Sequence, residues 1–197
     1  MTKNRLLNVA ILICKLFKLI YIIVFIIITG IFIHFQVNPS AYKNFDFNDF
    51  SIENDTNLKF KYETKSTFTY NNEKMPEVDE IYKIEKLTGA SSFFLYIESA
   101  LCIFLGFLCL KEFQNVLESV KKINTFQEGN VTSFRKIGKY LSMIFIVSSF
   151  SMLNYRNGEI MSFNFTITLP CLIMFSFIMA EIFKEGSMLS EEVNLTV

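Results

Sequence analysis

Four apolar segments, each close to the length of a membrane-spanning helix, constrain the fold of this chain more than any other feature. They cover residues 19–35, 90–110, 137–155 and 164–183. A helix needs about 20 mostly apolar residues to cross roughly 30 Å of bilayer hydrocarbon. The sequence therefore predicts an all-α membrane fold, in which a bundle of four transmembrane helices forms a single integral membrane domain over residues 1–197.

The fourth segment contains a proline in its first half. Within a helix that begins at Asn164, Pro170 removes the backbone hydrogen bond to the carbonyl of Thr166. The sequence therefore predicts a kink in the fourth span.

Charge and composition exclude several function classes. The 19 Lys and Arg residues balance 19 Asp and Glu residues, so the chain lacks the basic excess with which proteins neutralise nucleic-acid phosphates. One histidine and 4 cysteines leave few ligands for a metal site, and no metalloprotease, nucleophile-elbow, P-loop or dinucleotide motif occurs. We therefore expect no nucleic-acid partner, no cofactor and no enzymatic activity.

Basic residues predict the orientation of the chain, because Lys and Arg flank the cytoplasmic ends of membrane spans. Some precede the first segment without any acid, and others lie between the second and third segments or at the start of the third: Lys3, Arg5, Lys15, Lys18, Lys111, Lys121, Lys122, Arg135, Lys136 and Lys139. This distribution predicts cytoplasmic termini and a cytoplasmic middle connection, with Arg156 and Glu159 in a short outer turn.

Residues 37–88 form the predicted extracytoplasmic loop, which carries a strand pattern. From Leu58 to Tyr70, mostly apolar and aromatic residues alternate with mostly charged ones, which is the period of a β-strand. The length of this run predicts a bend or hairpin near residues 64–66, and a phase slip at Asn48 and Asp49 predicts a turn or bulge. The loop is either a cap that binds a ligand or partner or a small β lid over the outer ends of the spans. Because composition alone indicates no binding site, the lid is favoured.

Residues 111–136 form the predicted cytoplasmic connection, which continues the second span as an amphipathic helix. Its apolar stripe recurs at helical spacing and contains Phe113, Val116, Leu117, Val120 and Ile123. The stripe either binds a partner or lies on the membrane surface or against the N-terminal helix, and the second arrangement is the more common.

A candidate cytoplasmic interaction surface combines this stripe with a basic corner and with the tail, residues 184–197. Its members are Phe113, Leu117, Val120, Arg135, Lys136, Glu191, Glu192, Leu195 and Val197. The last two are apolar and exposed unless something covers them. Docking of the tail onto the connection would bring its glutamates near the basic corner, and a partner would compete for the same surface.

Glu98 lies near the middle of the second segment, where an ionised carboxylate is costly. It should therefore face the interior of the bundle. One interpretation is a protonated carboxyl bonded to Ser148, Ser149 or Ser151 of the third segment, and the other is a proton or cation relay. The structural interpretation is favoured, because no second acid or buried lysine lies at the same depth.

Three stretches in the C-terminal half resemble a known family. Residues 133–141 open the third segment with an Arg-Lys-Ile-Gly motif, and residues 181–189 and 191–197 close the chain. The tail pattern G-x-x-L-x-E-E-x-x-L-T-V is matched by Gly186, Leu189, Glu191, Glu192, Leu195, Thr196 and Val197. These stretches are similar to the uncharacterised bacterial four-helix membrane family of the YoaS type, domain of unknown function 2975. Residues 125–129 depart from the Gly-Pro-Phe-like turn of that family.

The resemblance implies a four-span inner-membrane protein of unknown activity, often encoded beside a small helix-turn-helix regulator, and it assigns no catalytic residue. Two function classes follow from the residues and the resemblance together. The favoured one is a non-enzymatic membrane protein that regulates or binds a cytoplasmic protein. The alternative is a small transporter or channel subunit that uses Glu98.

Overall fold

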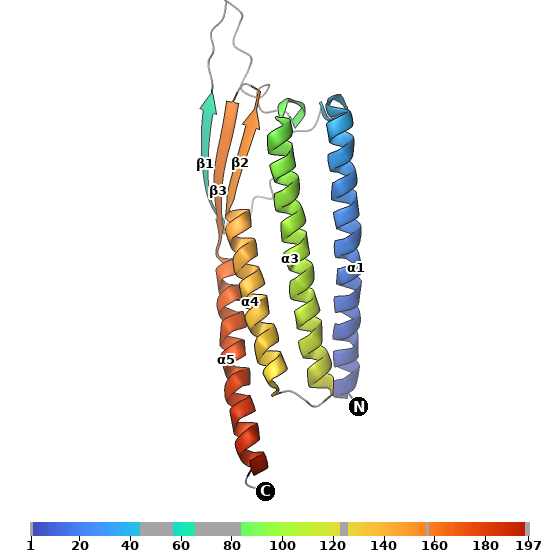
Figure 1. Cartoon of the computed structure of the whole chain (residues 1–197), viewed down its shortest axis with the longest axis vertical. Coiled ribbons are helices and arrows are strands. Elements are labelled where there is room, and N and C mark those ends of the chain that lie inside the picture. The colour runs from blue at the N-terminus through green and yellow to red at the C-terminus, as the bar shows by residue number, and fades with distance from the viewer. Residues whose placement is uncertain (1, 44–56, 66–83, 123–125, 157, 196–197) are drawn as a thin grey trace, which may run out of the picture. The chain divides into compact units, whose positions relative to one another are not determined.

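The computed structural model describes residues 2–43, 57–65, 84–122, 126–156 and 158–195. These residues are mostly helical, with a small antiparallel sheet (Figure 1). The long helices are α1 (Thr2–Val37), α3 (Gly89–Lys121), α4 (Glu128–Ser149) and α5 (Thr168–Leu195). The strands are β1 (Asn57–Lys65), β2 (Phe150–Tyr155) and β3 (Gly158–Thr166), and the short 3₁₀ helices are η1 (Pro39–Tyr42) and η3 (Ile84–Lys86).

Two of the described helices are long and apolar enough to cross a membrane. They are α1 over Arg5–Val37 and α3 over Gly89–Lys121, and only 6% and 11% of the residues in their most apolar stretches are buried. The core helix of a soluble protein would bury most of such a stretch, because exposed apolar area is unfavourable in water. The exposure of these two helices therefore favours a membrane protein.

The predicted third span is wrong at its end, because α4 stops at Ser149 and the next six residues form β2. A short apolar run does not by itself distinguish a helix from a strand. In this case the pairing with β3 makes the run a strand, since Phe150 lies opposite Phe163 and Tyr155 opposite Gly158. The expected short outer turn is thus part of a β-hairpin.

The predicted kink at Pro170 is also wrong. Residues 164–166 belong to β3 and α5 begins at Thr168, so the proline lies in the first turn of the helix. The first four backbone N–H groups of a helix have no acceptor within it, so a proline removes nothing there. The N–H of Cys171, the residue after the proline, donates a hydrogen bond of 3.2 Å to the carbonyl of Ile167.

The three-stranded sheet has the order β1-β3-β2, and both pairs are antiparallel. In the first pair Asn57 lies opposite Thr166 and Lys65 opposite Gly158. The strand predicted from Leu58 is confirmed as far as Lys65, while residues 66–70 and the predicted turn at residues 48–49 lie outside the described residues. The sheet therefore joins the loop before α3 to the connection between α4 and α5.

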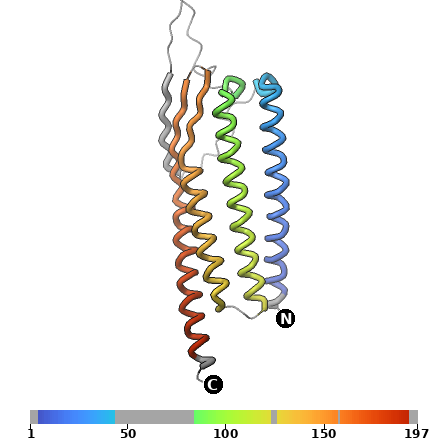
Figure 2. Tube along the Cα trace, in the orientation of Figure 1, coloured from blue at the N-terminus to red at the C-terminus, as the bar shows by residue number. Residues whose placement is uncertain are grey.

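Residue contacts divide the chain into two compact units. The first unit is Met1–Val24, Leu101–Ile146 and Ile167–Val197, and the second is Phe25–Ala100 and Val147–Thr166. Within the first unit, α4 and α5 run side by side (Figure 2). Its buried core comes from α3, α4 and α5 and contains Val116, Val131, Phe134, Ile137, Ala180 and Phe183. The core of the second unit contains Phe35, Leu87, Tyr155 and Ile160, so residues of β2 and β3 pack with the end of α1.

Candidate functional site

A polar cluster in the first unit is centred on Glu112, a buried residue near the end of α3. Ser133 of α4 donates a hydrogen bond of 2.8 Å to its Oε2 atom, and Asn115 donates a longer one of 3.4 Å to the same atom. The Lys136 Nζ atom lies 3.4 Å from Oε1. The Glu112 side chain is only 12% exposed, whereas that of Lys136 is 48% exposed. One carboxylate thus connects α3 to two successive turns of α4.

The electrostatics of Glu112 follow from its position beyond the apolar part of α3. The helix has 33 residues, a length of about 50 Å at 1.5 Å per residue. The predicted span ends at Leu110, two residues before Glu112. Burial raises the pKa of Glu112, but the hydrogen bond from Ser133 and the charge of Lys136 outweigh it and hold the pKa below its ordinary value. The carboxylate is therefore ionised at neutral pH.

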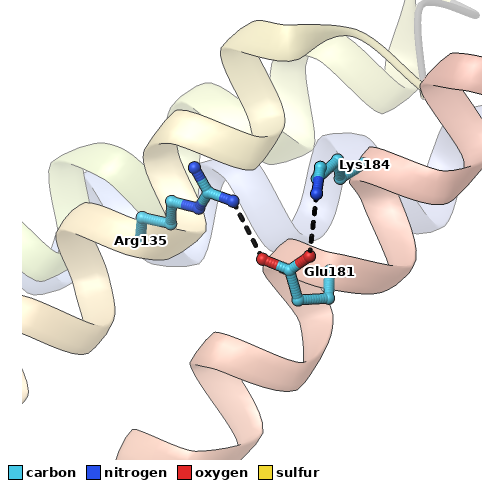
Figure 3. A network of polar contacts seen from close by, with 3 residues as sticks. All are labelled: Arg135, Glu181 and Lys184. Atoms are coloured by element: carbon cyan, nitrogen blue, oxygen red, sulfur yellow. Dashed lines mark hydrogen bonds and ion pairs between the residues drawn. The ribbon is translucent and has the colours of Figure 1, made fainter.

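A second polar contact joins α4 to α5 on the surface of the same unit. In Figure 3, Arg135 and Lys184 both point toward Glu181. The Arg135 Nη2 atom donates to Oε1 at 2.8 Å, and the Lys184 Nζ atom lies 3.5 Å from Oε2. Arg135 and Glu181 are 48% and 57% exposed. Exposed ion pairs contribute about 0–1 kcal/mol, so this contact orients the two helices more than it stabilises them.

An apolar groove lies along α5 beside that ion pair. It is lined by Phe126, Phe177, Ile178, Glu181, Ile182, Glu185, Gly186 and Leu189. Phe126 precedes α4, and its ring lies against Gly186 and 5.7 Å from the ring of Phe183. A Cβ atom at Gly186 would run into the Phe126 ring. The glycine therefore lets the aromatic ring form one wall of the groove.

The groove combines exposed apolar side chains with negative charge. Ile178, Ile182 and Leu189 are each more than half exposed. They recur at intervals of four and seven residues, which places them on one face of α5. Glu181 and Glu185 lie among them and carry the only formal charges in the lining. Such a surface suits an apolar segment that has basic residues along its edges.

The structure brings together only part of the predicted cytoplasmic surface. Phe113 is exposed, Leu117 is half-buried, and Val120 packs against the core of the first unit. Arg135 contacts Glu181, and Lys136 contacts Glu112. Glu191 and Glu192 are exposed in the last turns of α5, Leu195 ends that helix, and Val197 lies outside the described residues.

The predicted intramembrane group lies in the second unit. Glu98 is half-buried on α3, Ser148 and Ser149 end α4, and Ser151 belongs to β2. The hydrogen bond predicted between Glu98 and one of these serines stays a prediction. No group of three or more His, Cys, Asp or Glu side chains converges on a metal-sized site in the part of the chain that the structure describes.

Sequence reasoning missed Glu112, Ser133, Phe126 and the apolar face of α5 as site residues. The spacing of Ile178, Ile182 and Leu189 along α5 is visible in the sequence. However, an apolar stripe in a predicted span is expected to face lipid. The partner of Glu112 lies 21 residues away and that of Glu181 lies 46 residues away. These contacts depend on how the helices pack, which no local pattern reports.

Comparison with known proteins identifies a family whose function is unknown. A family described as "Protein of unknown function (DUF2975)" matches residues 59–197, which include α3, α4, α5 and the whole sheet apart from the first two residues of β1. No curated protein matches the chain, and no solved structure does.

Proposed function

The chain belongs to the DUF2975 family of proteins of unknown function, and we propose that it is a non-enzymatic, multi-pass membrane protein. It binds a cytoplasmic protein through the end of the α5 groove that lies beyond the predicted fourth span and is lined by Phe126, Glu185, Gly186 and Leu189. In this proposal, four helices span a bacterial inner membrane and both termini are cytoplasmic. The observation that carries it is the groove itself, in which exposed apolar side chains and two carboxylates lie beside the basic corner of α4.

The distribution of charge supports the proposed orientation. The end of the first unit where α3 leads into α4 contains six basic residues, Lys111, Lys121, Lys122, Arg135, Lys136 and Lys139. Basic residues next to spans mark the cytoplasmic side of a membrane. The sheet belongs to the second unit and lies outside the cytoplasm in this topology.

The exposure of the remaining two helices supports four spans rather than two. On α4, Met143 and Ile146 are 54% and 69% exposed, and on α5, Met174 and Phe175 are 63% and 57% exposed. These residues lie within the predicted third and fourth apolar segments. Lipid contact accounts for exposed apolar side chains of this kind, whereas in water large apolar patches are disfavoured.

The chemistry of the groove defines the kind of partner. An amphipathic helix can lay its apolar face into a groove, with anchors at helical spacing. Lys or Arg residues on the edges of that helix would meet Glu185 of the groove, since Glu181 already contacts Arg135 and Lys184. We therefore expect the partner to contribute a basic amphipathic helix. No cofactor or catalytic residue is required for this role.

Site-specific photocrosslinking in cells tests the proposal. A photoreactive amino acid at Leu189, within the groove, should give a crosslink to one discrete polypeptide of the cytoplasm. Gly186→Leu should lower that yield at least tenfold, because its side chain enters the space between α5 and Phe126. Met188→Leu is the matched control, since Met188 is exposed one residue from Leu189 and does not line the groove.

The same experiment has a negative control on the same helix. Leu172 is 46% exposed near the start of α5 and lies far along the helix from the groove. A photoreactive residue there should crosslink only to lipid. Lipid adducts from both positions, with no polypeptide from Leu189, would contradict the proposed function.

A further inference from the structure

An apolar cavity of about 380 Å³ lies inside the second unit, between α1 and α3. Its helical walls are formed by Ile28, Ile31, Phe32 and Phe35 of α1 and by Ser92, Leu95, Tyr96 and Ser99 of α3. Both sets have the spacing i, i+3, i+4, i+7, which is the packing face of a helix. The packing faces of the two helices therefore lie opposite each other, and their side chains do not fill the space between them.

The cavity is closed at one end by residues outside the two helices. Tyr42 of η1, Ile84 of η3 and Leu87 form this cap. The Tyr42 hydroxyl bonds to the Nδ1 atom of His34 at 3.0 Å, and its ring packs edge-on to Phe35 with centroids 5.6 Å apart. The cap is thus held to the last turn of α1.

Most polar atoms in the wall already have partners within the protein. The Tyr96 hydroxyl contacts the Thr29 hydroxyl at 3.2 Å, and its ring stacks on Phe32 with centroids 4.4 Å apart. Ser92 accepts a hydrogen bond from Gln36 at 3.2 Å. Since these hydroxyls are satisfied, the cavity offers an occupant mainly apolar contact.

The size of the cavity fits a hydrocarbon chain. From Ile28 to Phe35 the wall extends for about 10 Å along α1. An apolar cavity of about 150 Å³ is already large enough to bind benzene. A flexible, narrow and linear molecule is therefore the occupant that fits.

We propose that this cavity holds one acyl chain of a membrane phospholipid. The inference rests on the membrane placement of α1 and α3, since at that depth phospholipid chains are the surrounding solvent. The lining contains no Lys or Arg side chain that would hold a free carboxylate. The phospholipid headgroup therefore stays at the membrane surface while one chain enters between the helices.

Photolabelling in vesicles tests the proposal with the full chain. The vesicles are phosphatidylcholine doped with a phosphatidylcholine that carries a diazirine near the end of one acyl chain. Peptide mapping should find adducts concentrated on cavity residues such as Phe32 and Leu95, above the level on the exposed face that contains Ile26. Ser99→Phe, which fills the cavity, should lower the cavity adducts at least fivefold, whereas Ser99→Ala should leave them unchanged.

Additional variants and probes distinguish the ways in which the proposal could be wrong. Leu95→Phe is a second filling variant in case Ser99→Phe does not fold, and the wild-type map is decisive by itself. Uniform labelling of the cavity and of the Ile26 face would overturn the proposal while leaving the membrane placement intact. A free fatty acid carrying the same diazirine, if it labelled the cavity better than the phospholipid, would overturn the assignment to a phospholipid chain. Absence of adducts from the Ile26 face would instead contradict the membrane placement.

Discussion

Phe134→Ala should lower the free energy of unfolding by about 3–5 kcal/mol, the cost typical of truncating a buried aromatic residue. Phe134 is 7% exposed in the core of the first unit, and its ring centroid lies 5.0 Å from that of Phe183. Inside lipid, burial of an apolar side chain gains little, because the acyl chains are equally apolar. Phe134 directly precedes the charged pair Arg135 and Lys136, so its side chain meets water rather than lipid in the unfolded protein. The full cost of truncating a buried aromatic residue therefore applies.

Denaturant unfolding of the protein in lipid nanodiscs measures this effect. Met143→Ala on the same helix is the control, because Met143 is 54% exposed within the predicted third span. Its truncation should change the free energy of unfolding by less than about 1 kcal/mol, since the side chain leaves no cavity. Equal effects of the two substitutions would contradict the packing of α4 against α3 and α5.

Glu112→Ala should lower the free energy of unfolding by about 2 kcal/mol. The substitution removes the acceptor of Ser133, whose side chain is buried, and an unsatisfied buried hydroxyl costs about 1–3 kcal/mol. Lys136 is 48% exposed and regains water, so it adds little. Glu181→Ala is the matched control, because that residue belongs to an exposed pair, and its loss should cost at most about 1 kcal/mol.

The pH dependence of the Glu112 effect has a definite sign. The pKa of Glu112 lies below its ordinary value of 4.5 in the folded protein, so the folded state binds its proton less readily than the unfolded state does. The stabilisation is therefore complete above the ordinary pKa and is lost as the pH falls through the lowered pKa of the folded protein. The difference in stability between the wild type and Glu112→Gln should shrink on acidification. A difference that grew on acidification would contradict the ion pair with Lys136.

The helices and one strand follow from local sequence patterns. The apolar runs that begin near Leu19 and Ala90 are long enough to identify about half of α1 and most of α3, and the alternation from Leu58 identifies β1. The sequence predicts a helix for the run from Phe150 to Tyr155, although a run of six apolar-rich residues fits either a helix or a strand. What makes it a strand is its pairing with β3, and this pairing also moves the start of α5 to Thr168 and places Pro170 in its first turn.

The candidate site was predictable only in part, for a related reason. The sequence identifies Arg135 and Lys136 as a basic corner, but their partners lie on other helices. The partner of Arg135 is 46 residues away and that of Lys136 is 24 residues away. The contact of Phe126 with Gly186 spans 60 residues and depends on how the start of α4 meets α5. Local periodicity identifies which residues share a face of one helix. It does not identify which faces of different helices meet.

Reporter fusions at three positions test the central claim, a membrane protein with cytoplasmic termini, most directly. Alkaline phosphatase is active only outside the cytoplasm and green fluorescent protein fluoresces only inside it, so paired fusions locate each position. We expect cytoplasmic signals after Val197 and within residues 113–129, and an outside signal near Lys65. Lys and Arg precede the first span and flank the middle connection, and four spans return the chain to its starting side. An outside signal after Val197, or cytoplasmic signals at all three positions, would contradict the account.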